Sequence, residues 1–217
     1  MSPEKLKLHI ESLLQDENFE DAVAAIEQLN RLEPLSDAYR ITQARCHAKL
    51  GRITEAREEF LSLALGRKIT ATQMLQVAKG LADLGCPDLS MRVCEWVIES
   101  DESHSQAYFD MGVYSAKAGE PLYLTEALTH RAIQLDPTNA KYRFGLIALL
   151  VQLGRDDEVA KHCPELEISQ VDQICCVDCL KRVKAWAAKT GYQELAAACH
   201  EQLADLMSTP HTEGVLA

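Results

Sequence analysis

Glycines recur along this chain at a period of 34 residues, each after a run of apolar and other helix-compatible residues. They are Gly51, Gly85 and Gly119, and Gly154 follows after 35 residues. Glycine adopts a positive φ without the steric penalty of a Cβ atom, so it often ends an α-helix. The pattern therefore predicts two helices per 34 residues, and such pairs stack side by side into a solenoid.

Hydrophobic residues between the predicted turns are spaced three or four apart, as on one face of a helix. Ala22, Val23, Ile26 and Leu29 show this spacing. The whole chain is therefore predicted to be all-α, a solenoid of about six antiparallel helix pairs.

The C-terminal part departs from the period. Pro164 is expected to end one helix early, and Ser169 to cap a longer helix that runs to about Thr190, with Asp172 completing the capping motif. The predicted parts are five helix pairs over residues 1–168, a capping pair over 169–208 and a flexible tail over 209–217.

Several residues in this pattern resemble the tetratricopeptide repeat, which runs aromatic-x2-Leu-Gly, then Ala-x3-aromatic, then Pro. The matching residues are Tyr108, Met111, Gly112, Ala56 with Phe60, Ala22 with Ile26, Pro34 and Pro137. The residues that stand where this family usually has alanine are Ser90, Thr125 and Val159. The resemblance covers about residues 3–210. It implies a right-handed superhelix that binds proteins or peptides.

Composition and charge narrow the classes of function. The chain is 47% hydrophobic and 25% charged, as is usual for a folded globular protein. Its net charge of −11 disfavours binding to nucleic acid. Neither a signal stretch nor a run of about 20 apolar residues is present, so we expect no membrane insertion and a cytoplasmic location. The eight cysteines are then expected to be reduced.

Residues one period apart on the first helix of each pair are expected to line a concave groove. The predicted partner-binding residues are Ile41, Arg45, Leu75, Lys79, Phe109, Val113, Phe144 and Ala148. The four large apolar members would form a continuous stripe, and Arg45 and Lys79 would favour acidic side chains of a partner. Two alternatives stay open: Phe109 and Phe144 belong to the core, and the two cations lie on a solvated face.

The C-terminal cysteines form a second candidate site. Cys176 and Cys179 are three residues apart and are predicted to share one face of a helix, while Cys199 and His200 lie on the last helix. These four residues are candidate zinc ligands, since structural zinc takes four nitrogen or sulfur ligands. The favoured interpretation is that the cysteines are reduced, bind no metal and pack as small hydrophobic residues. No cofactor is expected.

No phosphate loop, dinucleotide-binding motif, nucleophile elbow or zinc-protease helix occurs in the sequence. We therefore predict a non-enzymatic interaction module or scaffold that binds a peptide or partner helix in its groove. One alternative is an assembly or secretion chaperone that holds a single client. The other is a zinc or thiol-redox protein that uses the C-terminal cysteines.

Overall fold

The structure is a computed structural model that describes residues 1–66 and 68–208. Within those residues all regular secondary structure is helical, which confirms the predicted fold class. The chain divides into two compact units, Met1–Glu102 and a second unit that begins at Ser103, and each is described by itself. The predicted tail, 209–217, lies outside the described residues.

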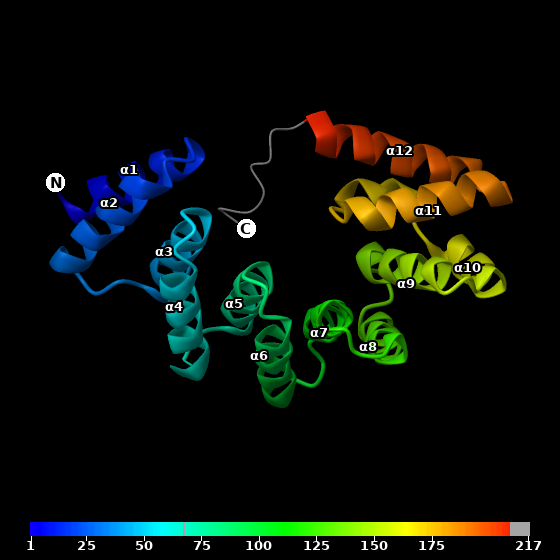
Figure 1. Ribbon diagram of the computed structural model, residues 1–217, viewed down its shortest axis with the longest axis horizontal. Helices are drawn as coiled ribbons and strands as arrows, with labels where there is room; N and C mark the ends of the chain where they lie inside the picture. The colour runs from blue at the N-terminus through cyan, green and yellow to red at the C-terminus, as the bar shows by residue number, and fades with distance from the viewer. Residues whose placement is uncertain (67, 209–217) are drawn as a thin grey trace. The chain divides into compact units, whose positions relative to one another are not determined.

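The first unit consists of three antiparallel helix pairs (Figure 1). Its helices are α1 (Pro3–Gln15), α2 (Phe19–Leu32), α3 (Asp37–Lys49), α4 (Ile53–Gly66), α5 (Ala71–Asp83) and α6 (Pro87–Ser100). Each odd-numbered helix packs on the helix that follows it, and α3 also packs on α5 of the next pair.

The second unit also contains three pairs, with two short 3₁₀ helices between the second and the third. Its elements are α7 (Ser105–Ala118), α8 (Leu122–Leu135), α9 (Ala140–Gln152), α10 (Asp156–His162), η1 (Cys163–Glu165), η2 (Ile168–Gln173), α11 (Val177–Thr190) and α12 (Gln193–Ser208). The division predicted at residue 168 stays a prediction.

The glycine turns lie where the period places them. Gly51, Gly85, Gly119 and Gly154 all have a positive φ, between 69° and 82°. Several helix starts are also fixed locally: the Thr70 side chain accepts from the Gln73 amide, and the Gln73 side chain accepts from the Thr70 amide in return. Local sequence therefore determines where the helices of most pairs begin and end.

One predicted boundary is wrong. Ser169 does not cap a long helix; it lies in η2, and α11 begins only at Val177. The Ile174 carbonyl accepts a hydrogen bond from Gln202 of α12 at 2.9 Å, and the Ile174 side chain is buried. This bond to another helix replaces the bond that a continuous helix would make, so the chain is extended at Ile174.

Each unit has its own hydrophobic core. In the first unit, Leu6 and Ile10 of α1 pack with Ile26 and Leu29 of α2. In the second, α9 is buried on most sides, and its Leu146 and Ile147 pack with Leu180 and Val183 of α11. Among the described residues no helix is both long enough and apolar enough to cross a membrane.

Candidate functional site

The first candidate surface lies on α3 and α5 in the first unit. Ser36 caps α3, and the capping box at Thr70 begins α5, so the two helices present residues one period apart. Leu75 is half-buried and Lys79 is exposed. Together with Arg45 and Asp83 they make up what we call the α3–α5 face.

Arg45 is the unusual residue of the α3–α5 face. Its side chain is half-buried, and burial lowers the pKa of the guanidinium, while the nearby Asp83 carboxylate opposes this shift. Within residues 1–66 and 68–208 the guanidinium has neither a hydrogen-bond nor an ion-pair partner. A half-buried cation without a direct partner is unfavourable, because burial removes part of its hydration and no partner group replaces it.

Three of the predicted groove residues are not on a surface at all. Ile41 is 2% exposed, Phe144 is 1% exposed and Ala148 is 2% exposed. Phe144 and Ala148 pack in the core of the second unit, where the Ala148 carbonyl accepts a hydrogen bond from Arg182 of α11. The prediction of a continuous exposed apolar stripe is therefore wrong, and the core alternative holds for Phe144.

The second candidate surface lies on α7 and α9 in the second unit. Phe109 and Val113 are half-buried there, and the Phe109 ring lies 4.9 Å from the Tyr142 ring, measured between centroids. The Tyr142 hydroxyl donates to Gln106 at 3.1 Å, and Gln106 donates to Asp110 at 2.7 Å. Tyr142 was not among the predicted residues, although its position two residues before Phe144 placed it on the same helix.

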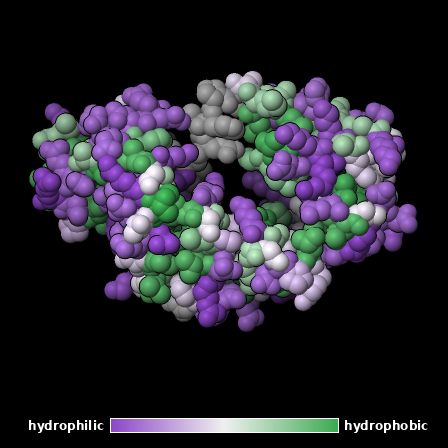
Figure 2. All heavy atoms as spheres, in the orientation of Figure 1, coloured by the Kyte–Doolittle hydropathy of each residue, from purple (hydrophilic) through white to green (hydrophobic). Residues whose placement is uncertain are grey.

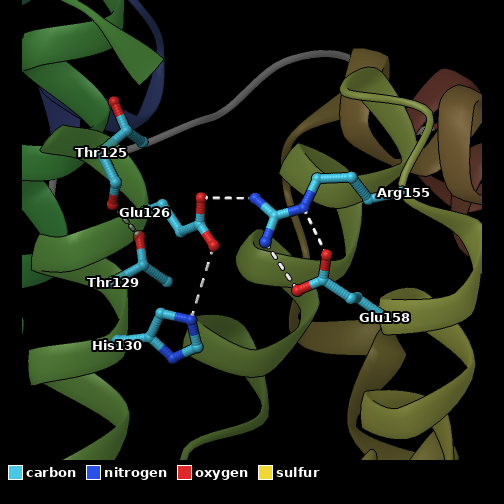
Figure 3. A network of polar contacts seen from close by, with 6 residues as sticks. All are labelled: Thr125, Glu126, Thr129, His130, Arg155 and Glu158. Carbon is cyan, nitrogen blue, oxygen red and sulfur yellow. Dashed lines mark hydrogen bonds and ion pairs between the residues drawn. The ribbon is translucent and has the colours of Figure 1, made fainter. Parts of the chain in front are cut away.

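A polar network joins α8 to the start of α10 in the second unit (Figure 3). Arg155 donates to Glu126 of α8 at 2.7 Å and makes two hydrogen bonds of 2.6 Å to Glu158 of α10. His130 lies 3.8 Å from the other side of Glu126. These contacts join the two helix pairs, so the network stabilises their stacking.

Thr125 explains one departure from the family pattern. Its hydroxyl lies 3.0 Å from the Ser115 hydroxyl of α7, and both side chains are buried. The Thr125 carbonyl also accepts a bond from the Thr129 hydroxyl, as Figure 3 shows. A hydroxyl pair therefore replaces the small apolar contact that alanine makes between the two helices of a pair.

The cysteines correct a third prediction. A disulfide joins Cys176 and Cys179, which were expected to be reduced, and Cys176 is the N-cap of α11. Cys199 is fully buried, while His200 is exposed and lies 3.0 Å from Lys184. Among the described residues no three His, Cys, Asp or Glu side chains are grouped to hold a metal ion.

Other surface features are dispersed. On the face seen in Figure 2, hydrophobic residues are interspersed with hydrophilic ones in both units. Exposed large hydrophobic side chains lie singly on different helices, such as Leu8, Leu65, Tyr123 and Met207. A hollow of about 370 Å³ in the second unit is lined by Cys163, Leu166, Ile168, Gly191, Tyr192, Gln193, Glu194 and Leu195. Singly exposed apolar residues do not by themselves mark a binding site.

The antiparallel pairs and the glycine turns define a helical-repeat protein. Comparison with known families is consistent with this class: residues 8–71 match the tetratricopeptide repeat family. The family match covers that segment, and the described residues as a whole share the helical-repeat fold of the solved structures below. A search of the curated proteins found no match to its sequence.

Solved structures share the fold at low sequence identity. PilW, a type IV pilus biogenesis factor, is 20% identical, with a TM-score of 0.64 over 97% of this chain and 95% of that chain. A tetratricopeptide repeat protein from Parabacteroides merdae is 16% identical, with a TM-score of 0.65 over 96% and 80%. MamA from Desulfovibrio magneticus RS-1, residues 41 to the end, is 19% identical, with a TM-score of 0.59 over 75% and 92%. At these identities the likeness concerns the fold.

Proposed function

We propose that this protein is a non-enzymatic interaction module that binds an acidic segment of a partner protein on the α3–α5 face. The observation that carries the proposal is the half-buried guanidinium of Arg45, which has no direct partner among the described residues. The tetratricopeptide repeat fold supports the general class of function, since helical repeats offer extended surfaces to protein partners.

A partner carboxylate would remove the unfavourable state of Arg45. Charge-assisted hydrogen bonds to a guanidinium are about twice as strong as neutral ones, and partial burial reduces competition from water. Asp83 is close enough to influence the Arg45 pKa but forms no ion pair with it, so the guanidinium donors stay available.

The other residues of the α3–α5 face define the rest of the segment. Leu75 is half-buried on α5 and offers an apolar contact, and Lys79 is exposed one turn further along the same helix. The bound segment is therefore expected to carry an aliphatic side chain next to Asp or Glu. Lys79 would mainly raise the association rate at low salt, because it is exposed and therefore screened.

A peptide-binding measurement tests the proposal. The probes are fluorescent peptides from an array in which an aliphatic residue is flanked by Asp or Glu, each paired with a version carrying Asn or Gln instead. The acidic peptides should bind more tightly. The double variant Arg45→Gln, Lys79→Gln should weaken their binding by about tenfold at low salt, and the difference should shrink as salt rises.

The matched control changes net charge equally on other helices. Arg31 on α2 and Arg57 on α4 are exposed, so Arg31→Gln with Arg57→Gln should leave peptide affinity nearly unchanged. Equal losses in the two double variants would show that only net charge matters. Equal binding of the acidic and amide peptides would also contradict the proposal.

A further inference from the structure

The segment that leads into α11 places two cysteines at a helix start. Cys176 is the N-cap residue and Cys179 is the third residue of the helix, with their Cα atoms 5.2 Å apart and a disulfide between them. Cys175, directly before them, is exposed and is not part of the disulfide. The arrangement therefore places an exposed free thiol directly before a bonded pair.

The two bonded sulfurs differ in accessibility. Cys176 is exposed, whereas Cys179 is partly buried and packs against the hydrophobic core of the second unit. Cys176 is therefore the more accessible of the two residues to an incoming thiol, while Cys179 lies against the core. In thiol–disulfide exchange, an incoming thiolate is therefore expected to attack Cys176, and Cys179 is expected to leave.

The backbone stabilises negative charge on Cys176. The Cys179 amide donates a hydrogen bond to the Cys176 sulfur at 3.3 Å, as in an N-cap. The N-terminal end of a helix also carries a partial positive charge. Both effects favour the thiolate form once the disulfide is reduced, and the thiolate is the reactive species.

The segment before the pair has an anchor outside the disulfide. Ile174 is buried, and its carbonyl accepts a bond from Gln202, whose side chain is itself 8% exposed. This anchor lies two residues before Cys176 and does not depend on the disulfide. Opening the bond should therefore leave the two thiols close enough to form it again.

We propose that Cys176 and Cys179 form a thiol–disulfide exchange site whose substrates are thiols and disulfides such as glutathione. A glutathione thiolate attacks the Cys176 sulfur, the Cys176–Cys179 bond breaks, and Cys179 leaves as a thiolate that takes up a proton. A second glutathione thiolate attacks the glutathione sulfur of this mixed disulfide and releases the Cys176 thiolate. Two thiols are oxidised to glutathione disulfide, and the protein disulfide is reduced by two electrons.

A redox titration of the full chain is the first test. The folded protein is equilibrated with mixtures of reduced and oxidised glutathione, quenched with acid, alkylated and analysed by peptide mass spectrometry. Cys176 and Cys179 should change state together as one two-electron couple, and Cys175→Ser should leave their midpoint unchanged. A pair that stays oxidised, or stays reduced, across all mixtures of the folded protein would overturn the proposal.

Two single variants test the roles of the two sulfurs. With oxidised glutathione in excess, Cys179→Ser should accumulate a mixed disulfide with glutathione on residue 176, because the Cys179 thiol that displaces glutathione in the wild type is absent. In the same variant, iodoacetamide should modify Cys176 at neutral pH about tenfold faster than Cys175. Cys176→Ser should accumulate much less adduct on residue 179. Equal adducts in the two variants, or equal rates for Cys175 and Cys176, would show that the site has no directed exchange chemistry.

Discussion

The Phe60 ring of α4 packs directly on Gly80 of α5, and a β-carbon at position 80 would overlap the ring. Phe60 is fully buried at this contact. The second unit contains the same arrangement, since a β-carbon at Gly145 of α9 would lie 2.7 Å from the Phe109 ring of α7. In both places the missing side chain lets an aromatic ring of one helix pair pack against the backbone of the next.

Replacing Gly80 with alanine should destabilise the first unit. The added methyl group overlaps a buried ring, and overpacking of this kind costs about 1–3 kcal/mol. Alanine favours a helix over glycine by up to about 1 kcal/mol, which offsets only part of that loss. Urea unfolding followed by circular dichroism should therefore show a lower midpoint for Gly80→Ala.

Gly66→Ala is the matched control for this prediction. Gly66 is the last residue of α4, and a β-carbon there meets nothing within 4 Å. The change should be neutral or stabilising by up to about 1 kcal/mol. If Gly80→Ala and Gly66→Ala changed the unfolding midpoint equally, the contact between the Phe60 ring and Gly80 would not exclude a β-carbon.

The turns were predictable because they depend on local chemistry. A positive φ is strained for any residue with a β-carbon, so a glycine repeated after each helical run marks a turn whatever surrounds it. Gly51 and Gly85 lie at such turns, and Gly191 ends α11 in the same way, with a φ of 91°. The middle helix pairs followed directly from this spacing.

The exposure of the groove residues was not predictable from the same period. Ile41 and Leu75 occupy equivalent positions, but Ile41 is buried and Leu75 is only half-buried. Equivalent positions differ because the residues that cover them come from neighbouring pairs whose side chains are not repeated. Phe144 is buried because α9 also packs against η2 and α11, which lie in the part that departs from the period.

The cysteine pair shows a different limit. The sequence places Cys176 and Cys179 three residues apart, and this spacing fits one helix face as well as an N-cap with the third helical residue. The long-range bond between Gln202 and Ile174 decides between them, because it ends η2 and lets α11 begin at Val177. The residues around Cys176 do not predict this bond, because its donor, Gln202, lies on α12.

Removing the positive charge of Arg155 should weaken the contact between α8 and the start of α10. Arg155 holds Glu126 and Glu158 at once (Figure 3), so Arg155→Gln should lower the unfolding midpoint at neutral pH. Hydrogen bonds from Arg155 lower the Glu158 pKa below its ordinary value of 4.5. A carboxylate with a depressed pKa contributes stability above 4.5 and loses it as the pH falls through the folded-state value.

The difference between wild type and Arg155→Gln should therefore shrink as the pH is lowered below 4.5. Arg92→Gln is the control, because Arg92 is largely exposed and its ion pair with Glu95 lies within a single helix. Urea unfolding at neutral and acid pH measures both variants. A pH-independent difference for Arg155→Gln would mean that the carboxylates do not contribute through this network.

The hydrogen bond from the Trp186 indole to Asp156 should stabilise the last helix pair. It joins α11 to the first turn of α10 at 2.9 Å, and Trp186 is otherwise buried. Asp156→Ala removes the acceptor and should cost about 1–3 kcal/mol, because the indole N–H is left without a partner. Asp157→Ala is the control, since Asp157 lies in the same first turn and has the same relation to the helix dipole. Equal midpoints in thermal unfolding would contradict a role for this bond.

Three buried thiols should make the protein sensitive to alkaline pH. Burial raises the pKa of Cys46, Cys163 and Cys199 to about 11, from an ordinary value of 9.0. Between these values the unfolded chain releases protons that the folded chain retains. Stability that is fully present below pH 9.0 should therefore fall as the pH rises through about 11.

The triple variant Cys46→Ala, Cys163→Ala, Cys199→Ala isolates this contribution, because other groups also titrate in the alkaline range. At pH 8 the variant should be less stable than wild type, since each substitution removes a buried sulfur atom. Its further loss of stability toward pH 11 should nevertheless be smaller than that of wild type. Cys175→Ala, at an exposed position, should follow the wild-type pH dependence. The measurement is the urea unfolding midpoint from pH 8 to 11. If the midpoints of wild type and the triple variant fall in parallel, the buried thiols do not cause the loss of stability at alkaline pH.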